Sequence, residues 1–492
     1  MYNYPYYELV MNGPLTQIEK MPMVLAFFQQ ININIIDEKL LMYFWMLIRI
    51  IKSLLFEILY TFCGTYMIYC WYYDDWKRGL KIFIKGIIIA LIIMLVYNIF
   101  EILYLMGNNW AERILIKITP YFHTIKTAYN WWPPLLWKGQ LRSYFSEPSN
   151  YGTYFAVVMP FLWYKIVKYE NRKSLLIYSI LIIFFTFCLF LTNARTAVAL
   201  FLGELILLFL FTLIVRNRKL FCNAIIIIIC SMFAFVSSNI FISNYIKQTP
   251  ITNTIQKVTK KVEIEQNNNI KPARQEINNQ ANVTKTKKTT EINKTINRSS
   301  ILNENQFIEY IENNLLSLIN LNKRSNNARY STIIADFNIG LNNPMLGVGT
   351  GLRNAYVPEY LPEFSKKNKE VNLWINLQKE KGILKSGFPN LCEYTNKFAE
   401  TGILGLGIFL LPAIILLKNL LMKIKDNSLE FSLKAVYIYF TIAFIGIMAS
   451  AIGSTINATY FYWILLGLGY AMCFGKENDV KDNGDTSSWQ EH

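Results

Sequence analysis

Long apolar runs alternate with short polar segments along most of this sequence. A helix needs about 20 apolar residues to cross the hydrocarbon core of a bilayer, and several of the runs approach or exceed that length. The pattern predicts nine membrane-spanning helices, at residues 54–72, 82–106, 151–167, 174–191, 197–215, 221–240, 402–417, 435–449 and 461–474. A tenth, short span within the polar or interfacial N-terminal region of residues 1–53 would place the N-terminus in the cytoplasm.

Two polar segments between the predicted spans are much longer than the others. The first, residues 107–149, is rich in aromatic side chains and is expected outside the membrane, at its surface. The second, residues 241–400, forms one large extracytoplasmic loop between late spans. Within this loop, residues 248–327 have too few apolar side chains to offset the entropy of ordering, which predicts disorder. Residues 328–400 are expected to form a partly helical cap.

Composition supports a membrane protein. Hydrophobic residues make up 53% of the 492 residues, and charged residues make up only 17%. Soluble proteins carry about 25% charged residues, and a large soluble helical protein would need such charged faces to stay in solution. We therefore predict an all-α polytopic membrane protein with about nine or ten transmembrane helices, within residues 54–240 and 401–474, and a cytoplasmic tail at residues 475–492.

The formal net charge of +16 does not indicate a nucleic-acid partner, because no DNA- or RNA-binding motif accompanies it. Many of the basic residues lie in short clusters between apolar runs, as the positive-inside rule describes for cytoplasmic loops. The clusters are Lys77, Arg78 and Lys81; Lys165, Lys168, Arg172 and Lys173; Arg216, Arg218 and Lys219; and Lys418, Lys423 and Lys425.

Three arginines lie beside predicted span ends on the external side: Arg142, Arg195 and Arg329. A guanidinium keeps its charge in partly dry sites and binds phosphate or carboxylate with two hydrogen bonds. Three of them together would suit a diphosphate at the membrane surface. The alternative is that each arginine extends to the interface or pairs with a helix end. For Arg195, in a very short turn between two spans, we favour a functional role.

Other candidate features are less specific. Glu147 precedes a predicted span, where a carboxylate is either a helix-capping group or a general base. The GVGTG segment at residues 347–351 follows no predicted strand and has no lysine after it, so a turn that closes a short helix is favoured over a phosphate-binding loop. With two separated histidines, His123 and His492, and most cysteines in apolar runs, no metal site and no cofactor are expected.

Four motifs in series resemble the O-antigen polymerase and O-antigen ligase superfamily. They are RSYFSEPSNYGTYFAVVMP, LTNARTAVALFLGELILL, RYSTIIADFNIGLNNPMLGVGTG and NKFAETGILGLGIFLL, and their order and spacing agree over about residues 80–474. The resemblance implies a metal-independent glycosyltransferase on the outer face of the cytoplasmic (inner) membrane. Its substrates would be undecaprenyl-diphosphate-linked oligosaccharides, and a flippase and a chain-length regulator of the same pathway would be its partners.

The resemblance also implies roles for single residues. Arg142, Arg195 and Arg329 match the recurring arginines that would bind the diphosphate. Glu400 matches the acidic residue before a Gly-x-x-Gly helix start. Together with Glu147, it is a candidate catalytic carboxylate.

The chain departs from the ligases of the superfamily at one point. Those ligases usually carry a histidine shortly before the matching glutamate, whereas this chain reads PNLCEYTNKFAE there. Glu393 is the nearest replacement for the base, with Asn390 as a hydrogen-bonding alternative. The departure favours a polymerase of repeat units for a capsule, an exopolysaccharide or an O-antigen.

Three alternatives to the polymerase remain. One is a ligase-type glycan transferase. A second is a transporter or flippase of lipid-linked oligosaccharides, which predicts charged residues deep in several spans and internal repeats, and the sequence gives little sign of either. The third is a membrane scaffold or sensor, which would depend on residues 250–325 rather than on the arginines.

Overall fold

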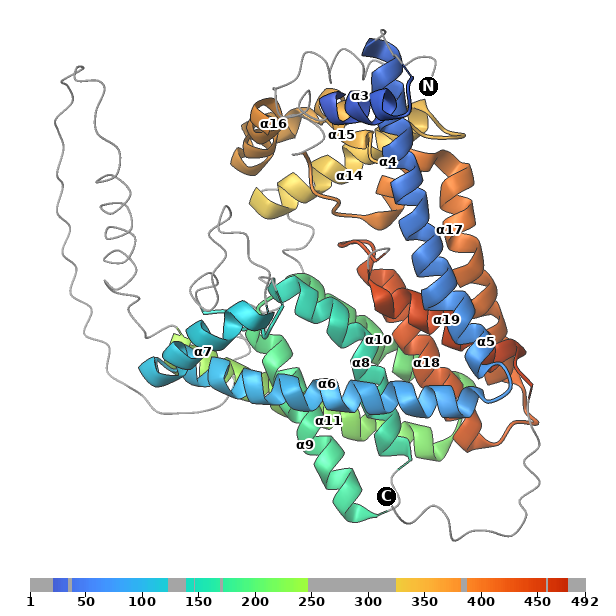
Figure 1. The fold of residues 1–492 in the computed structure, drawn as a ribbon. Helices are drawn as coiled ribbons and strands as arrows, with labels where there is room; N and C mark the ends of the chain where they lie inside the picture. Colours follow the sequence, from blue (N-terminus) through green and yellow to red (C-terminus); the bar gives the residue numbers. More distant parts are fainter. Residues whose placement is uncertain are drawn as a thin grey trace, which may run out of the picture.

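The computed structural model describes residues 21–33, 38–122, 139–145, 147–168, 171–246, 324–381, 387–456 and 459–476. Every regular element in these residues is a helix, and the longest helices form a bundle (Figure 1). The prediction of an all-α polytopic membrane protein is therefore confirmed. Residues 248–323, His123, the tryptophans of residues 131–137 and the tail from residue 477 lie outside the described part.

Seven segments of the described chain are long and apolar enough to cross a membrane. They are Leu54–Tyr72, α6 (Trp76–Leu105), α9 (Arg172–Leu191), α10 (Arg195–Val215), Arg218–Ile246 with α11 (Arg218–Phe241), α17 (Glu393–Lys425) and α18 (Phe431–Ser450). The two other predicted spans coincide with α8 (Pro148–Val167) and with the shorter α19 (Tyr460–Phe474). Each of the nine predicted spans thus corresponds to a helix. Two of these helices, α8 and α19, are not among the seven segments that are long and apolar enough to cross a membrane.

Helix α8 lies at the centre of the bundle, in contact with α9, α10 and α18. Its side chains are buried on every face, as expected for a helix that is apolar all round. Gly152 of α8 packs against Ala197 of α10, and Gly446 of α18 packs against the backbone of Ala156. A Cβ at Gly152 would collide with Ala197, and a Cβ at Gly446 would be in tight contact with Ala156, so the three helices approach each other closely.

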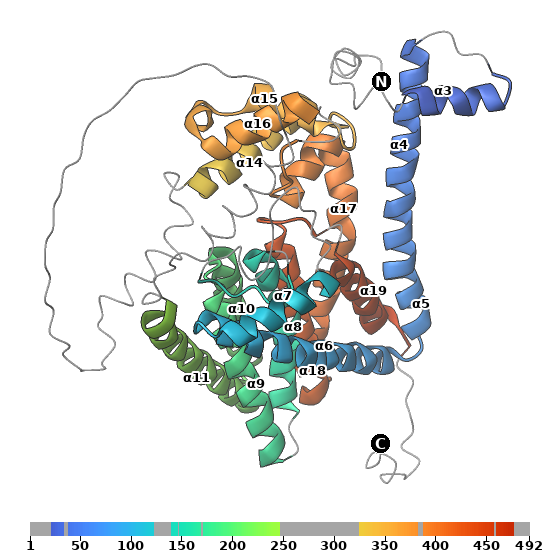
Figure 2. The ribbon, with the colours of Figure 1, turned by 60° about the vertical axis from the view of Figure 1, so that its left-hand side comes forward.

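The N-terminal part of the chain adds one long helix beside this bundle (Figure 2). Helix α3 (Met21–Gln30) precedes α4 (Glu38–Thr61), which continues through a π-helical turn, η1 (Phe62–Tyr66), into α5 (Met67–Tyr72). The helix therefore runs unbroken from the predicted interfacial region into the first predicted span. The turn packs against α19, where the Trp463 carbonyl accepts a hydrogen bond from the Thr65 hydroxyl at 3.1 Å.

The residues that we expect to form a cap contain several short helices at one end of the bundle (Figures 1 and 2). They are α14 (Arg324–Asn342), α15 (Arg353–Tyr360), the 3₁₀ turn η5 (Glu363–Lys367) and α16 (Lys369–Lys381). These elements share a small apolar core, which consists of Ala328, Ala335, Ile339, Val357, Val371, Phe388 and Ala399. Because Ala399 belongs to α17, that core joins the cap to a membrane helix.

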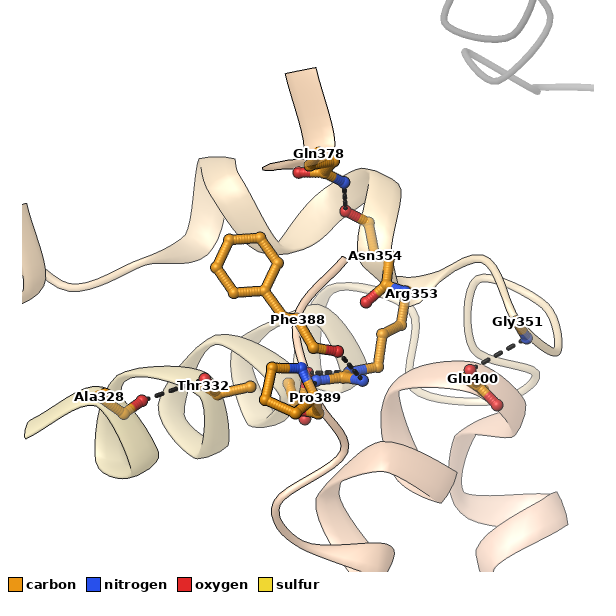
Figure 3. A network of polar contacts seen from close by, with 10 residues as sticks. Ala328, Thr332, Gly351, Arg353, Asn354, Gln378, Phe388, Pro389 and Glu400 are labelled. Atoms are coloured by element: carbon orange, nitrogen blue, oxygen red, sulfur yellow. Dashed lines mark hydrogen bonds and ion pairs between the residues drawn. The ribbon is translucent and has the colours of Figure 1, made fainter. Parts of the chain in front are cut away.

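A buried ion pair holds the cap together (Figure 3). The Arg353 Nε donates a hydrogen bond to the Asp336 carboxylate at 2.6 Å, and the two side chains are only 4% and 1% exposed. The guanidinium of Arg353 also donates to the carbonyls of Phe388 and Pro389, at 3.3 and 3.0 Å. Burial raises the pKa of Asp336 to about 6, against the opposing effect of Arg353, so the carboxyl is still mostly ionised at pH 7.

We expect Asp336→Ala to lower the stability of the folded protein by about 3–5 kcal/mol, because it leaves the buried Arg353 charge without its partner. The loss should appear as a lower unfolding temperature of the detergent-purified protein. Glu363→Ala is the matched control, because it breaks an exposed ion pair with Lys366, and exposed pairs contribute little to stability. An equal loss in both variants would contradict this role for the buried pair.

Candidate functional site

A cavity of about 740 Å³ lies between α8, α10, α14 and α18. Its outer part is lined by polar side chains, which include Glu147, Arg195 and Arg329. Its inner part follows α10 and α18 and carries the carboxyl of Glu204. The other residues of this inner part are apolar or small: Ala199, Leu200, Gly203, Ile206, Leu207, Ile445, Gly446 and Ala449.

A tight turn places Arg195 at the outer rim of the cavity. The turn from α9 to α10 is closed by the Thr192 hydroxyl, which accepts a hydrogen bond from the Ala194 N–H at 3.1 Å, while Asn193 adopts φ +48°. Arg195 is the first residue of α10, and its Nη2 donates to the Ser325 hydroxyl of α14 at 3.1 Å. The guanidinium thus reaches from a membrane helix across to the cap.

Arg329 lies on the opposite wall, on α14. One of its Nη atoms donates a hydrogen bond to the carbonyl of Gly453, in the connection that follows α18. Burial lowers the pKa of Arg329, the nearby charge of Glu147 raises it, and the charge of Arg195 lowers it again. The two arginines and Glu147 therefore interact electrostatically at the outer end of the cavity.

Glu147 is positioned by the start of α8. It occupies the N-cap of this helix in an extended conformation, and Pro148 follows at the first helical position, which proline favours. The carboxylate makes no side-chain cap hydrogen bond and instead accepts one from the Ser149 hydroxyl at 3.2 Å. The close packing of Gly152 on Ala197 holds this helix start beside the start of α10. Glu147 and Arg195 therefore face the same cavity.

The other three candidate residues do not line this cavity. Arg142 is 2% exposed, and its backbone N–H and that of Ser143 donate to the Glu101 carboxylate at 3.0 and 2.7 Å. Glu393 is also 2% exposed and accepts a hydrogen bond from the Ile456 N–H at 3.2 Å. Both residues thus join segments that are distant in sequence.

Glu400 lies on α17, where this helix meets the cap, and accepts the Gly351 N–H at 3.0 Å (Figure 3). The neighbouring turn is bonded to α17 in the same way: Val348 N–H donates to the Ala399 carbonyl at 2.9 Å, and Gly349 N–H to the Glu400 carbonyl at 2.8 Å. These donors are used within the protein. The GVGTG segment is therefore a turn, packed on α17, and its amides do not form a phosphate-binding cradle.

This turn sits on a break in α17 at Gly402, which has φ +65°. The Ile403 N–H beyond the break donates to the Pro344 carbonyl at 2.7 Å instead of to its own helix. A Cβ on Gly402 would collide with the Met345 backbone, and a Cβ on Gly347 would collide with the Glu400 backbone. Glycine is therefore required on both sides of this contact.

One known family resembles part of this chain. Residues 178–375 match the family model described as O-antigen ligase. The match covers less than half of the chain, and it supports the resemblance to the O-antigen polymerase and ligase superfamily. The matched residues include α10 and α14, and hence Arg195 and Arg329. Searches of the curated proteins and of the solved structures returned no match.

Sequence reasoning missed two features, one in the cavity and one in the cap. The first is Glu204, which lies within the predicted span 197–215, where an ionisable residue is itself a sign of function. The second is the Arg353–Asp336 pair, whose two residues are far enough apart in sequence that no short motif shows it. Among the described residues, no three His, Cys, Asp or Glu side chains gather as metal ligands would.

We predict that Gly347→Ala weakens the contact between the turn and α17. Gly347 has φ +64°, and an added methyl group would collide with the α17 backbone. The expected cost is more than about 1 kcal/mol, because alanine is strained at positive φ. The measurement is the unfolding temperature together with the rate of proteolysis of the cap.

Gly407→Ala is the control for this substitution. Gly407 lies on the same helix with open space where a Cβ would go, so alanine there should neither lower the unfolding temperature nor speed proteolysis of the cap. Unchanged stability of Gly347→Ala would show that the contact is not needed.

Proposed function

We propose that the protein is a polymerase of undecaprenyl-diphosphate-linked oligosaccharide repeat units, for a capsule, an exopolysaccharide or an O-antigen. It would act on the outer face of the cytoplasmic membrane, at the cavity between α8, α10, α14 and α18. The supporting observation is the convergence of Arg195 and Arg329, both inside the family-matched region, at one end of this cavity. Arginine pairs of this kind suit a diphosphate, which they bind through charge-assisted hydrogen bonds.

The reaction that we propose is a glycosyl transfer. A hydroxyl oxygen of the acceptor sugar attacks the anomeric carbon of the donor, and the bond from that carbon to the diphosphate oxygen breaks. The diphosphate leaves with the bonding electrons, and Arg195 and Arg329 stabilise its growing negative charge. Glu147, which lines the same cavity, is our candidate for taking the hydroxyl proton.

Ligase-type transfer of a finished glycan is the second candidate, and the family description favours it. The two reactions share the donor and the leaving group, and they differ in the acceptor. The segment before Glu400 supports the polymerase, because it has no histidine where the ligases of the superfamily usually carry one. Its buried Glu393 is bonded to the Ile456 backbone and does not line the cavity.

We expect Arg195→Ala and Arg329→Ala each to lower polymer production by about 10²–10³-fold, since each removes a donor to the leaving group. Lysine in either position should restore only part of the activity, because it keeps the charge and loses the paired hydrogen bonds. Polymer length and amount in cells, with protein levels checked, are the readouts. Arg172→Ala, at the exposed start of α9, is the control. A normal yield of full-length polymer from Arg195→Ala would contradict the proposal.

The cavity itself can be tested by filling it. Gly203 lines the inner part, and a Cβ there meets no atom within 4 Å, so Gly203→Leu should fold normally and narrow the cavity. We expect polymer production to fall at least about tenfold, while the unfolding temperature stays unchanged or rises, since glycine is a poor helix former. Gly86→Leu, at a similarly open position of α6 outside the cavity, is the control. Normal polymer from Gly203→Leu would place the site elsewhere.

A further inference from the structure

Glu204 lies at the inner end of the cavity, away from the arginines. It follows Arg195 by nine residues on α10, which corresponds to a rise of about 14 Å along the helix. The side chain is only 2% exposed. Gly446 of α18 leaves the room that the carboxyl occupies, because a Cβ there would collide with Oε1 of Glu204.

The carboxyl of Glu204 has no hydrogen-bond partner among the described residues, at either oxygen. The cations that line the cavity, Arg195 and Arg329, are at its outer end. An ionised carboxylate in apolar surroundings is strongly disfavoured unless it is paired, so the neutral carboxyl is the favoured form of Glu204. A partnerless polar group is costly even when it is neutral. Leucine at this position, which has no polar group to bury, would therefore stabilise the fold better.

A neutral carboxyl donates one hydrogen bond through its O–H and accepts others at its carbonyl oxygen. It therefore complements an oxygen-rich group such as a phosphate or a sugar hydroxyl. The cavity, at about 740 Å³, is large enough for such a group. Its volume falls in the usual range of ligand sites. The outer arginines would hold the charged part of the same ligand.

We propose that Glu204 is a substrate-binding residue that hydrogen-bonds, as a neutral carboxyl, to an oxygen of the lipid-linked glycan at the inner end of the cavity. This inference rests on the proposed function and adds a contact to the same site. It gives the two carboxyls separate roles: Glu147 at the outer end takes the proton of the acceptor hydroxyl, and Glu204 at the inner end binds the substrate.

The test compares Glu204→Leu with Glu204→Gln. Glu204→Leu should lower polymer production at least about tenfold, the effect of losing one strong hydrogen bond, while its unfolding temperature equals or exceeds that of the unchanged protein. Glu204→Gln, which still donates and accepts, should keep production within a few-fold. Thr212→Val is the control on the same helix, because this buried hydroxyl bonds to the Phe209 carbonyl and lies outside the cavity.

Binding of undecaprenyl diphosphate without sugar identifies which oxygen is bound. A tenfold weaker affinity of Glu204→Leu for this probe assigns the contact to the phosphates. Unchanged affinity together with lost polymer production assigns it to the sugar. Both results support the proposal.

Three results would overturn the proposal. The first is full production and full affinity in Glu204→Leu, which a substrate contact does not allow. The second is an unfolding temperature of Glu204→Leu that falls together with its production, which marks a structural role. The third is a failure of Glu204→Gln as severe as that of Glu204→Leu, which indicates the ionised form. Normal polymer from a strain that lacks the protein would instead contradict the proposed function itself. A failure of the proposed function can therefore be told apart from a failure of the proposal for Glu204.

Discussion

The close approach of α8, α10 and α18 is the constraint on which the site depends. Apolar side chains gain nothing from leaving lipid for protein, so helices in a membrane associate through tight van der Waals packing between small residues. Gly152 against Ala197 and Gly446 against Ala156 supply that packing here. Because the contact at Gly152 lies near the starts of α8 and α10, it also fixes the positions of Glu147 and Arg195.

The cap completes the cavity from the outside through polar contacts. Arg195 donates to Ser325 of α14, and Arg329 of α14 donates to the Gly453 carbonyl beyond α18. Each arginine thus joins the cap to the bundle while it lines the cavity. The Arg353–Asp336 pair joins α14 to α15, and the turn at Gly347 packs on α17; neither lines the cavity.

The sequence predicted the helical membrane class well, because hydropathy depends on composition over about 20 residues and needs no tertiary information. It also predicted that Arg142, Arg195 and Arg329 belong to one face, and two of the three, Arg195 and Arg329, line one cavity. It did not show that Arg142 and Glu393 bond to Glu101 and Ile456, since those contacts join segments distant in sequence. Glu204 escaped notice for another reason: a single carboxyl hardly changes the mean hydropathy of a span, and only its position in the bundle shows its importance.

The central claim is that this cavity joins lipid-linked repeat units into a polymer. The lipid-linked glycans of a strain that lacks the protein test it most directly. The account predicts that single repeat units accumulate on undecaprenyl diphosphate and that the polymer disappears. Long chains that remain on the lipid carrier would contradict it and indicate a ligase.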